Sequence, residues 1–258
     1  MSRTVETEFF MGQGIVLISE LDANFNPIGY KEMGDVSDLG FETNVDNIEY
    51  NENQSGMQNV AFSKNTKSVT NVSMTTPSAT KDNMARFVSG TLADVAAGTG
   101  VTKSITAKLG LSASLGKIKV SSVVLKGTGD DSAITYVLDK NYTVNTETGS
   151  IYIMTAAEQT AASAVATIAD GDVLEATFNH AAQSTIEASS ATGKIVAVRF
   201  EGMNTAKNNE PVLVEIPRAQ FDPAKGFKLI SQELQMFELS GKCLAPHPIK
   251  PYKVTMLA

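Results

Sequence analysis

Two stretches of the sequence indicate the fold, Ser37-Asp-Leu-Gly-Phe-Glu-Thr-Asn-Val45 and Ser68-Val-Thr-Asn-Val-Ser-Met-Thr75. In both, apolar or β-branched residues alternate with polar ones, which places the two kinds on opposite faces of an extended chain. The polar face of the first stretch holds Asp38, Glu42 and Asn44. We therefore predict two long strands, Ser37–Val45 and Ser68–Thr75, each with one buried face and one wet face.

The segment Asp46–Lys67 separates these two predicted strands, and it is too long for a tight hairpin turn. Loops of this length are usually functional or disordered. This one contains five large apolar residues: Ile48, Tyr50, Met57, Val60 and Phe62. A purely solvated loop does not favour such residues, so we expect this segment to dock on a partner, with a neighbouring subunit as the first candidate.

A helix is predicted directly after the second strand, where the apolar spacing changes to that of a helix. The expected stripe on its core side consists of Met84, Phe87, Val88 and Leu92. Ser78 or Thr80 can cap the first turn, because a hydroxyl oxygen can accept a bond from a free backbone N–H group. Gly90 or Gly98 is expected to end the helix.

The composition excludes several classes of protein. The 258 residues carry a formal net charge of −7, and an acidic surface repels phosphate, so a general nucleic-acid binder is disfavoured. Charged residues make up only 19%, which is typical of chains that bury surface against other subunits. The single cysteine, Cys243, excludes an internal disulfide. We expect neither a signal peptide nor a membrane span, because no sufficiently long apolar run is present.

A change in composition near Gly98–Thr102 suggests an inserted subdomain over residues 103–190, within a larger domain formed by residues 1–102 and 191–258. Strands are predicted in the insert because β-forming runs alternate there with turn residues. These strands are Ile118–Leu125, Val173–Phe178 and a hairpin of Thr135–Val144 with Ile151–Met154. The Ala-rich segment Ala156–Ala169 fits either a short helix or a loop.

The larger domain has further predicted strands on both sides of the insert. These are Ile15–Leu21, Lys194–Glu201, Pro211–Pro217 and Phe227–Ser240. The prolines of Pro211–Pro217 suggest a short or edge strand, because proline cannot donate to a sheet. Extended arms are expected at both ends, over Ser2–Gly14 and Pro246–Ala258.

No pattern typical of catalysis is complete. Gly110-Leu-Ser112-Ala-Ser114 lacks the closing glycine of a nucleophile elbow, and Asp139-Lys-Asn141 has no calcium-loop continuation. Cys243 and His247 are close in sequence but are separated by proline, and a free cysteine without a role is the more economical interpretation. We therefore expect no enzyme activity, no metal and no cofactor.

Several short signatures together resemble the major tail tube protein of long, non-contractile-tailed bacteriophages. They cover about two thirds of the chain, and no single one is diagnostic. The signatures are Gly12–Met33, Asp46–Gly56, Met74-Thr-Thr, Asp82–Val88, Arg199–Asn204, Val214–Pro217 and Phe227–Gly241.

The resemblance implies a mainly β fold: a β-sandwich or barrel with one flanking α-helix, plus a small inserted β-subdomain on the outside of a tube. It further implies hexameric rings that stack into a hollow tail tube for double-stranded DNA. The apolar loop would reach the next ring, and Asp38, Glu42 and Asn44 would face the lumen. The implied partners are further copies of the chain, a tape measure protein, and tail tip and tail terminator proteins. The implied location is the virion, after assembly in the host bacterial cytoplasm.

Other functions stay open at this point. The second hypothesis is an adhesin-like β-sandwich module that binds or decorates a virion or cell surface through the insert. A third is the tube of a bacterial secretion or contractile injection system. The polar face of Ser37–Val45 also fits a strand face that simply meets solvent.

Overall fold

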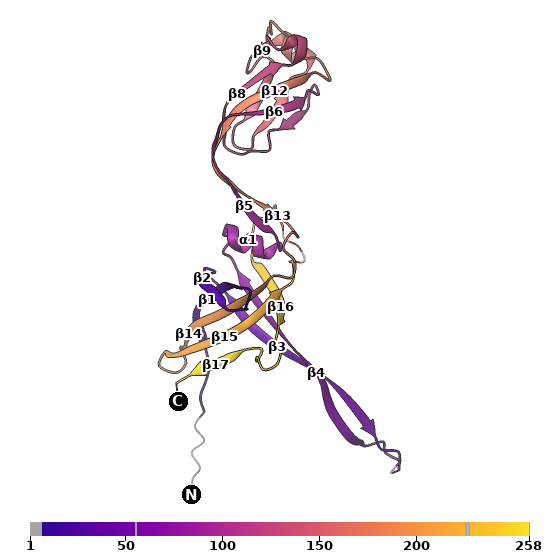
Figure 1. Ribbon diagram of the computed structural model, residues 1–258, viewed down its shortest axis with the longest axis vertical. Coiled ribbons are helices and arrows are strands. Elements are labelled where there is room, and N and C mark those ends of the chain that lie inside the picture. The colour runs from indigo at the N-terminus through magenta and orange to yellow at the C-terminus, as the bar shows by residue number, and fades with distance from the viewer. Residues whose placement is uncertain (1–6, 55, 225, 227, 258) are drawn as a thin grey trace. The chain divides into compact units, whose positions relative to one another are not determined.

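The computed structural model describes residues 7–54, 56–224, 226 and 228–257 (Figure 1). The protein is mainly β, with seventeen strands and two short α-helices among these residues. The chain divides into two compact units: unit 1 is Met1–Leu92 with Ile186–Ala258, and unit 2 is Ala93–Thr185. Unit 2 begins earlier than the expected insert at residue 103, because the strand Gly98–Thr106 belongs to its main sheet.

Unit 1 is built on one eight-stranded antiparallel sheet in the order β2-β1-β14-β15-β16-β4-β3, with β17 also paired to β15. Its strands are β1 Gly12–Leu21, β2 Pro27–Glu32, β3 Asp38–Asn51, β4 Val60–Thr76, β14 Ile195–Asn204, β15 Glu210–Phe221, β16 Phe237–Cys243 and β17 Lys253–Met256. Along β15, Ala219–Phe221 pair with β16, and Val212–Glu215 pair with β17. The sheet therefore divides at β15.

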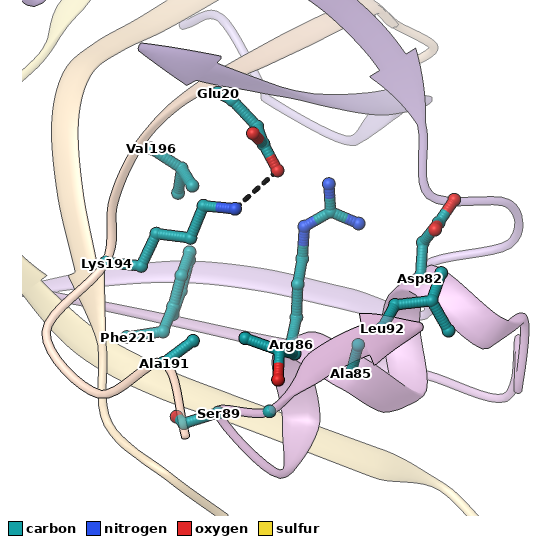
Figure 2. Close-up of a pocket in the computed structure, with 12 residues that line it drawn as sticks. Glu20, Asp82, Ala85, Arg86, Ser89, Leu92, Ala191, Lys194, Val196 and Phe221 are labelled. Atoms are coloured by element: carbon teal, nitrogen blue, oxygen red, sulfur yellow. Dashed lines mark hydrogen bonds and ion pairs between the residues drawn. The ribbon is translucent and has the colours of Figure 1, made fainter. Parts of the chain in front are cut away.

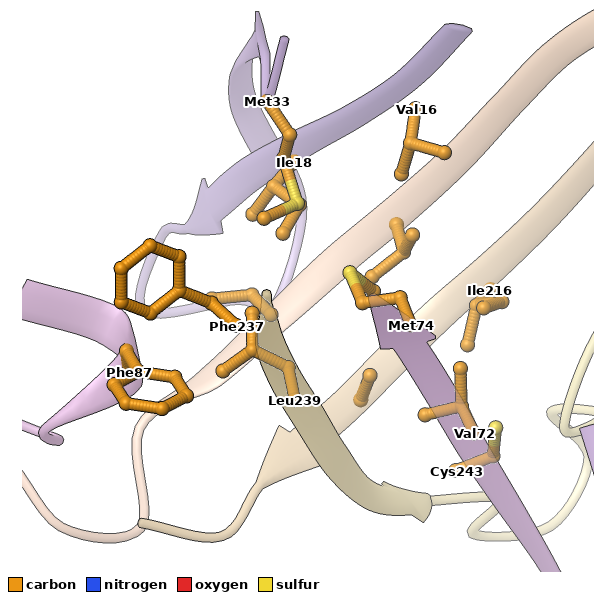
Figure 3. Close-up of a cluster of buried hydrophobic side chains, with 13 residues drawn as sticks. Val16, Ile18, Met33, Val72, Met74, Phe87, Ile216, Phe237, Leu239 and Cys243 are labelled. Carbon is orange, nitrogen blue, oxygen red and sulfur yellow. The ribbon is translucent and has the colours of Figure 1, made fainter. Parts of the chain in front are cut away.

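Both parts of the divided sheet contribute to one hydrophobic core (Figure 3). Ile18 of β1 and Ile216 of β15 are buried together with Met74 of β4 and Leu239 of β16. In β16 every second residue is buried, which is the period expected of a strand with one wet face. The core explains why the alternating patterns of the sequence mark true strands in this unit.

Helix α1, Lys81–Phe87, closes one end of this core. Thr80, and not Ser78, is its N-cap, because the Thr80 hydroxyl accepts a bond from the backbone N–H of Asn83. The Phe87 ring meets Phe237 edge to face, with centroids 5.0 Å apart (Figure 3). Met84 and Val88 pack on the same core.

The predicted helix is too long at its C-terminal end. Ser89 has a φ of 47°, which breaks the helix before Gly90. Leu92 therefore does not belong to the helical stripe. It lies in β5, Thr91–Val95, which pairs with β13, Gln183–Glu187.

Two further strand predictions need correction. Pro211–Pro217 is part of a longer interior strand, β15. Pro217 is tolerated in it because the pairing with β14 shifts register opposite this residue, between Val196 and Val198. The strand predicted over Phe227–Ser240 is restricted to Phe237–Cys243. Phe227 lies outside the described residues, and no strand forms over 228–236. The pattern misled because its apolar residues do not pack: Leu229, Ile230 and Leu234 are exposed.

The terminal arms are also partly ordered. β1 begins at Gly12, inside the expected arm Ser2–Gly14, whose first residues lie outside the described part of the chain. The expected C-terminal arm contributes β17, which adds to the edge of β15. In both cases, pairing with the sheet gives hydrogen-bond partners to backbone N–H and C=O groups that would otherwise lack them.

Unit 2 has its own core between a four-stranded sheet, β6-β12-β8-β9, and a three-stranded sheet, β10-β11-β7. The strands are β6 Gly98–Thr106, β7 Ser112–Ser114, β8 Val120–Gly127, β9 Thr135–Tyr136, β10 Tyr142–Asn145, β11 Ser150–Ile153 and β12 Val173–His180. The Ala-rich segment begins as a helix, α2 Ala156–Ala161, and continues as a loop. A buried amide pair holds that loop: Asn141 donates to the Gln159 side chain, and Ile168 N–H donates to Gln159 Oε1.

A pair of substitutions distinguishes core from exposed strand positions. Met74→Ala removes a side chain with no exposed surface, so we expect the free energy of unfolding to fall by about 2 to 5 kcal/mol. Ile48→Ala removes a side chain that is 60% exposed, so we expect a change within about 0.5 kcal/mol. Chemical denaturation of the dilute protein measures both. Equal losses for the two variants would contradict this assignment of the core.

Candidate functional site

The expected loop Asp46–Lys67 is for the most part an extension of β3 and β4. The two strands stay paired from Asp38 with Thr75 out to Asn51 with Val60. We call residues 47–65 the β3–β4 arm; in Figure 1 it projects from the end of unit 1 that lies away from α1. The loop prediction was wrong because two register shifts interrupt the alternation that would have revealed the strands.

The arm has an apolar face and a polar face. Tyr50 lies opposite Phe62 and Ile48 opposite Lys64, so these four side chains share one face. The other face carries polar residues, including Glu49 opposite Ser63. All five predicted docking residues are exposed, by 53% to 80%: Ile48, Tyr50, Met57, Val60 and Phe62. Met57 lies in the tip between the two strands.

A register shift determines the direction in which the apolar face of the arm points. In the body of unit 1, Leu39 and Phe41 pack toward the core, and Phe41 stacks on Tyr252 with centroids 4.8 Å apart. The pairing of β4 skips Thr66, which reverses the facing of β4 beyond that point. Phe62 and Lys64 therefore join Ile48 and Tyr50, which continue the outer face of β3, away from the core.

The predicted lumen residues Asp38, Glu42 and Asn44 are all exposed on this outer face of β3. Across the sheet, Glu42 aligns with Asn71 and Lys242, and Asp38 aligns with Thr75 and Glu238. Asp46 and Lys67 pair farther along the same face. The result is a polar face over β3, β4 and β16, with four carboxylates and two ammonium groups. Its charge is net negative.

Two edges of the unit 1 sheet offer unpaired backbone groups. The strand order ends at β2 on one side and at β3 on the other. Every residue of β2 is exposed, as is every residue of β17. Such edges are templates for pairing with another chain.

A pocket of about 340 Å³ lies beside α1 (Figure 2). Ala85, Leu92 and Phe221 form part of an apolar wall. Lys194 Nζ lies 2.5 Å from Glu20 Oε1, and Lys31 binds Asp82, whose pKa this ammonium lowers below its ordinary value. No local sequence pattern reveals this pocket, because its residues come from segments far apart in the chain.

Of the residues considered for catalysis, Cys243 has the most clearly defined surroundings. Cys243 is a buried part of the unit 1 core, and burial raises the pKa of its thiol to about 11. Among the described residues no cluster of three or more His, Cys, Asp or Glu side chains is arranged to hold a metal ion. None of the described helices is long and apolar enough to cross a membrane.

The raised pKa predicts a slow reaction of Cys243 with iodoacetamide. A pH of 8 lies about three units below the thiol pKa of about 11, so about one molecule in a thousand carries the reactive thiolate. Labelling should accelerate as the pH rises toward 11. It should also accelerate in guanidinium chloride, which removes the burial. Mass spectrometry measures the rate, and fast labelling of the folded protein at pH 8 would contradict the buried assignment.

No curated protein matches the sequence. Residues 9–250 match a family described only as a protein of unknown function, UCP028589. This match spans β1 to β16 and therefore both units. The chain belongs to the uncharacterised family UCP028589.

Proposed function

We propose that this protein is a structural subunit that assembles with copies of itself into a hollow tube, as the major tail tube protein of long-tailed phages does. Six copies form a ring, and the rings stack head to tail through the β3–β4 arm. In this proposal double-stranded DNA passes through the lumen, and tape measure, tail tip and terminator proteins set the length and ends of the tube. The mainly β fold and the open sheet edges support it.

The observation that carries the proposal is the apolar face of the arm. An isolated two-stranded hairpin is marginally stable in water, and exposed apolar stripes usually mark interaction sites. Ile48, Tyr50 and Phe62 form such a stripe on a hairpin that leaves the core behind. Contact with another copy would bury it. A contact of this kind joins two different surfaces, so it repeats without closing and generates a stack.

The polar face supports the second part of the proposal, the passage of DNA. Asp38, Glu42 and Glu238 outnumber Lys242 on this face. A lumen with a net negative lining repels the phosphate backbone, so DNA slides along it without binding. Asp38, Glu42 and Asn44 are polar and exposed, which also disfavours this part of the face as a protein contact.

An arm-deleted variant tests the assembly. Asp46 and Lys67 are cross-strand partners, so residues 47–66 can be replaced by Asn-Gly, which favours a two-residue hairpin turn. Negative-stain electron microscopy over a range of concentrations should show tubes or stacked rings for the unmodified protein. The deleted variant should form single rings or monomers. A monomer at every concentration for the unmodified protein, with tail tip proteins added as nucleators, would refute the proposal and favour the surface-binding alternative.

A matched pair of triple variants separates the apolar stripe from the hairpin itself. Ile48→Thr, Tyr50→Thr and Phe62→Thr remove the stripe but keep β-forming residues, and they should abolish stacking. The control changes the opposite face, with Asn47→Thr, Ser63→Thr and Asn65→Thr, and should still stack.

A further inference from the structure

Arg86 is the side chain of the α1 pocket that lacks a strong partner. It lies in the last turn of α1, is half-buried, and extends its guanidinium group into the pocket beside Glu20, Lys194 and Asp82 (Figure 2). Those three neighbours have ion pairs, whereas the guanidinium group of Arg86 has no hydrogen bond or ion pair within the described part of the chain and only a longer-range attraction to Asp82. A half-buried guanidinium without an acceptor has lost part of its hydration and gained no bond in return.

The pocket therefore suits a ligand with one acidic and one apolar group. Its lining carries two cations, Arg86 and Lys194, and two carboxylates, Glu20 and Asp82. Lys31 lies outside the lining but pairs with Asp82, and Lys194 pairs with Glu20, so the positive charge of Arg86 remains. The apolar wall around Leu92 and Phe221 offers contact for an aliphatic side chain. A volume of about 340 Å³ accommodates side chains at the end of a protruding segment, but not a whole paired strand.

The arm has the complementary properties. The arm and its base together carry three carboxylates, Asp46, Glu49 and Glu52, and two ammonium groups, Lys64 and Lys67. Their net charge is therefore −1. Glu52 lies where β3 gives way to the tip, and its carboxylate accepts a bond from the N–H of Gln54 at 3.0 Å. Met57 in the tip is 80% exposed, and methionine is long and adaptable enough to fill an irregular apolar space.

The placement of the two surfaces excludes their contact within one copy. Within unit 1, α1 lies at one end of the sheet and the arm projects from the other (Figure 1). A head-to-tail repeat brings the arm end of one copy against the α1 end of the next. The pocket and the arm tip are therefore suited to meet in a stack.

We propose that the α1 pocket is the receptor for the arm tip of a second copy, with Arg86 bound to Glu52 and Met57 packed on the apolar wall. This inference rests on the proposed stacking function and names its receiving site. It makes Arg86 and Glu52 the residues that fix how successive rings join.

Charge reversal of each partner tests this pairing. Arg86→Glu and Glu52→Arg should each raise the protein concentration needed for assembly by about tenfold or more, because each places like charges together. A mixture of the two variants restores opposite charges at every junction if copies alternate, so the mixture should form tubes although neither variant does alone. Sedimentation and electron microscopy measure the assembled fraction, and circular dichroism verifies that each variant is folded.

The control is Glu175→Arg, which reverses an exposed carboxylate of unit 2 and should assemble like the unmodified protein. If the two variants assemble normally while the arm-deleted variant does not, the stacking function stands and this receptor is wrong. Suppose that both variants fold and that neither assembles alone. If their mixture also fails to assemble, the pairing of Arg86 with Glu52 is wrong. If the unmodified protein never assembles, both proposals are overturned.

Discussion

The β3–β4 pair continues beyond the hydrophobic core that stabilises its base, and the outer part is held only by contacts between its own two strands. Near the base, Val72 and Met74 are buried among side chains of four other strands and a helix. Beyond the register shift at Thr66, every residue on both strands is exposed. Burial of apolar surface contributes roughly 25 cal/mol per Å², and the arm of a single copy gains little of it. Ordering of the arm is therefore expected to depend on a partner that covers it.

The regular alternation of β3 also links the two proposed surfaces. Because β3 is regular along its length, Glu42 and Asn44 share a face with Ile48 and Tyr50. That face is polar beside the core and apolar on the arm. In a tube, the first part would line the lumen of one ring and the second would contact the next ring. A single strand would then serve both the passage of DNA and the joining of rings.

The elements that were predictable from the sequence are those in which local pattern and tertiary packing agree. The alternation around Leu39 and Met74 marked strands because the same residues form the core. Thr80 was one of two predicted caps, and the hairpin of β10 and β11 was visible from its turn residues. The apolar residues of the arm identified a candidate interaction segment although its structure was predicted wrongly.

The parts that were missed depend on long-range contacts or on breaks in periodicity. Bulges conceal the strands of the arm, and a left-handed residue at Ser89 separates Leu92 from its apparent helical stripe. The apolar run at Leu229 to Leu234 has strand-like composition but finds no neighbour within the described chain to pair with. The α1 pocket joins β1, α1 and the start of β14, which no local pattern connects.

The most direct test of the central claim is hydrogen exchange of the arm amides in the dilute and the assembled protein. If another copy covers the arm, the amides of residues 47–51 and 60–65 should exchange rapidly in dilute protein and at least about ten times more slowly after assembly, while those of β14 stay protected in both. Equal exchange of the arm in the two states would contradict the claim, because it would show that assembly does not cover this segment.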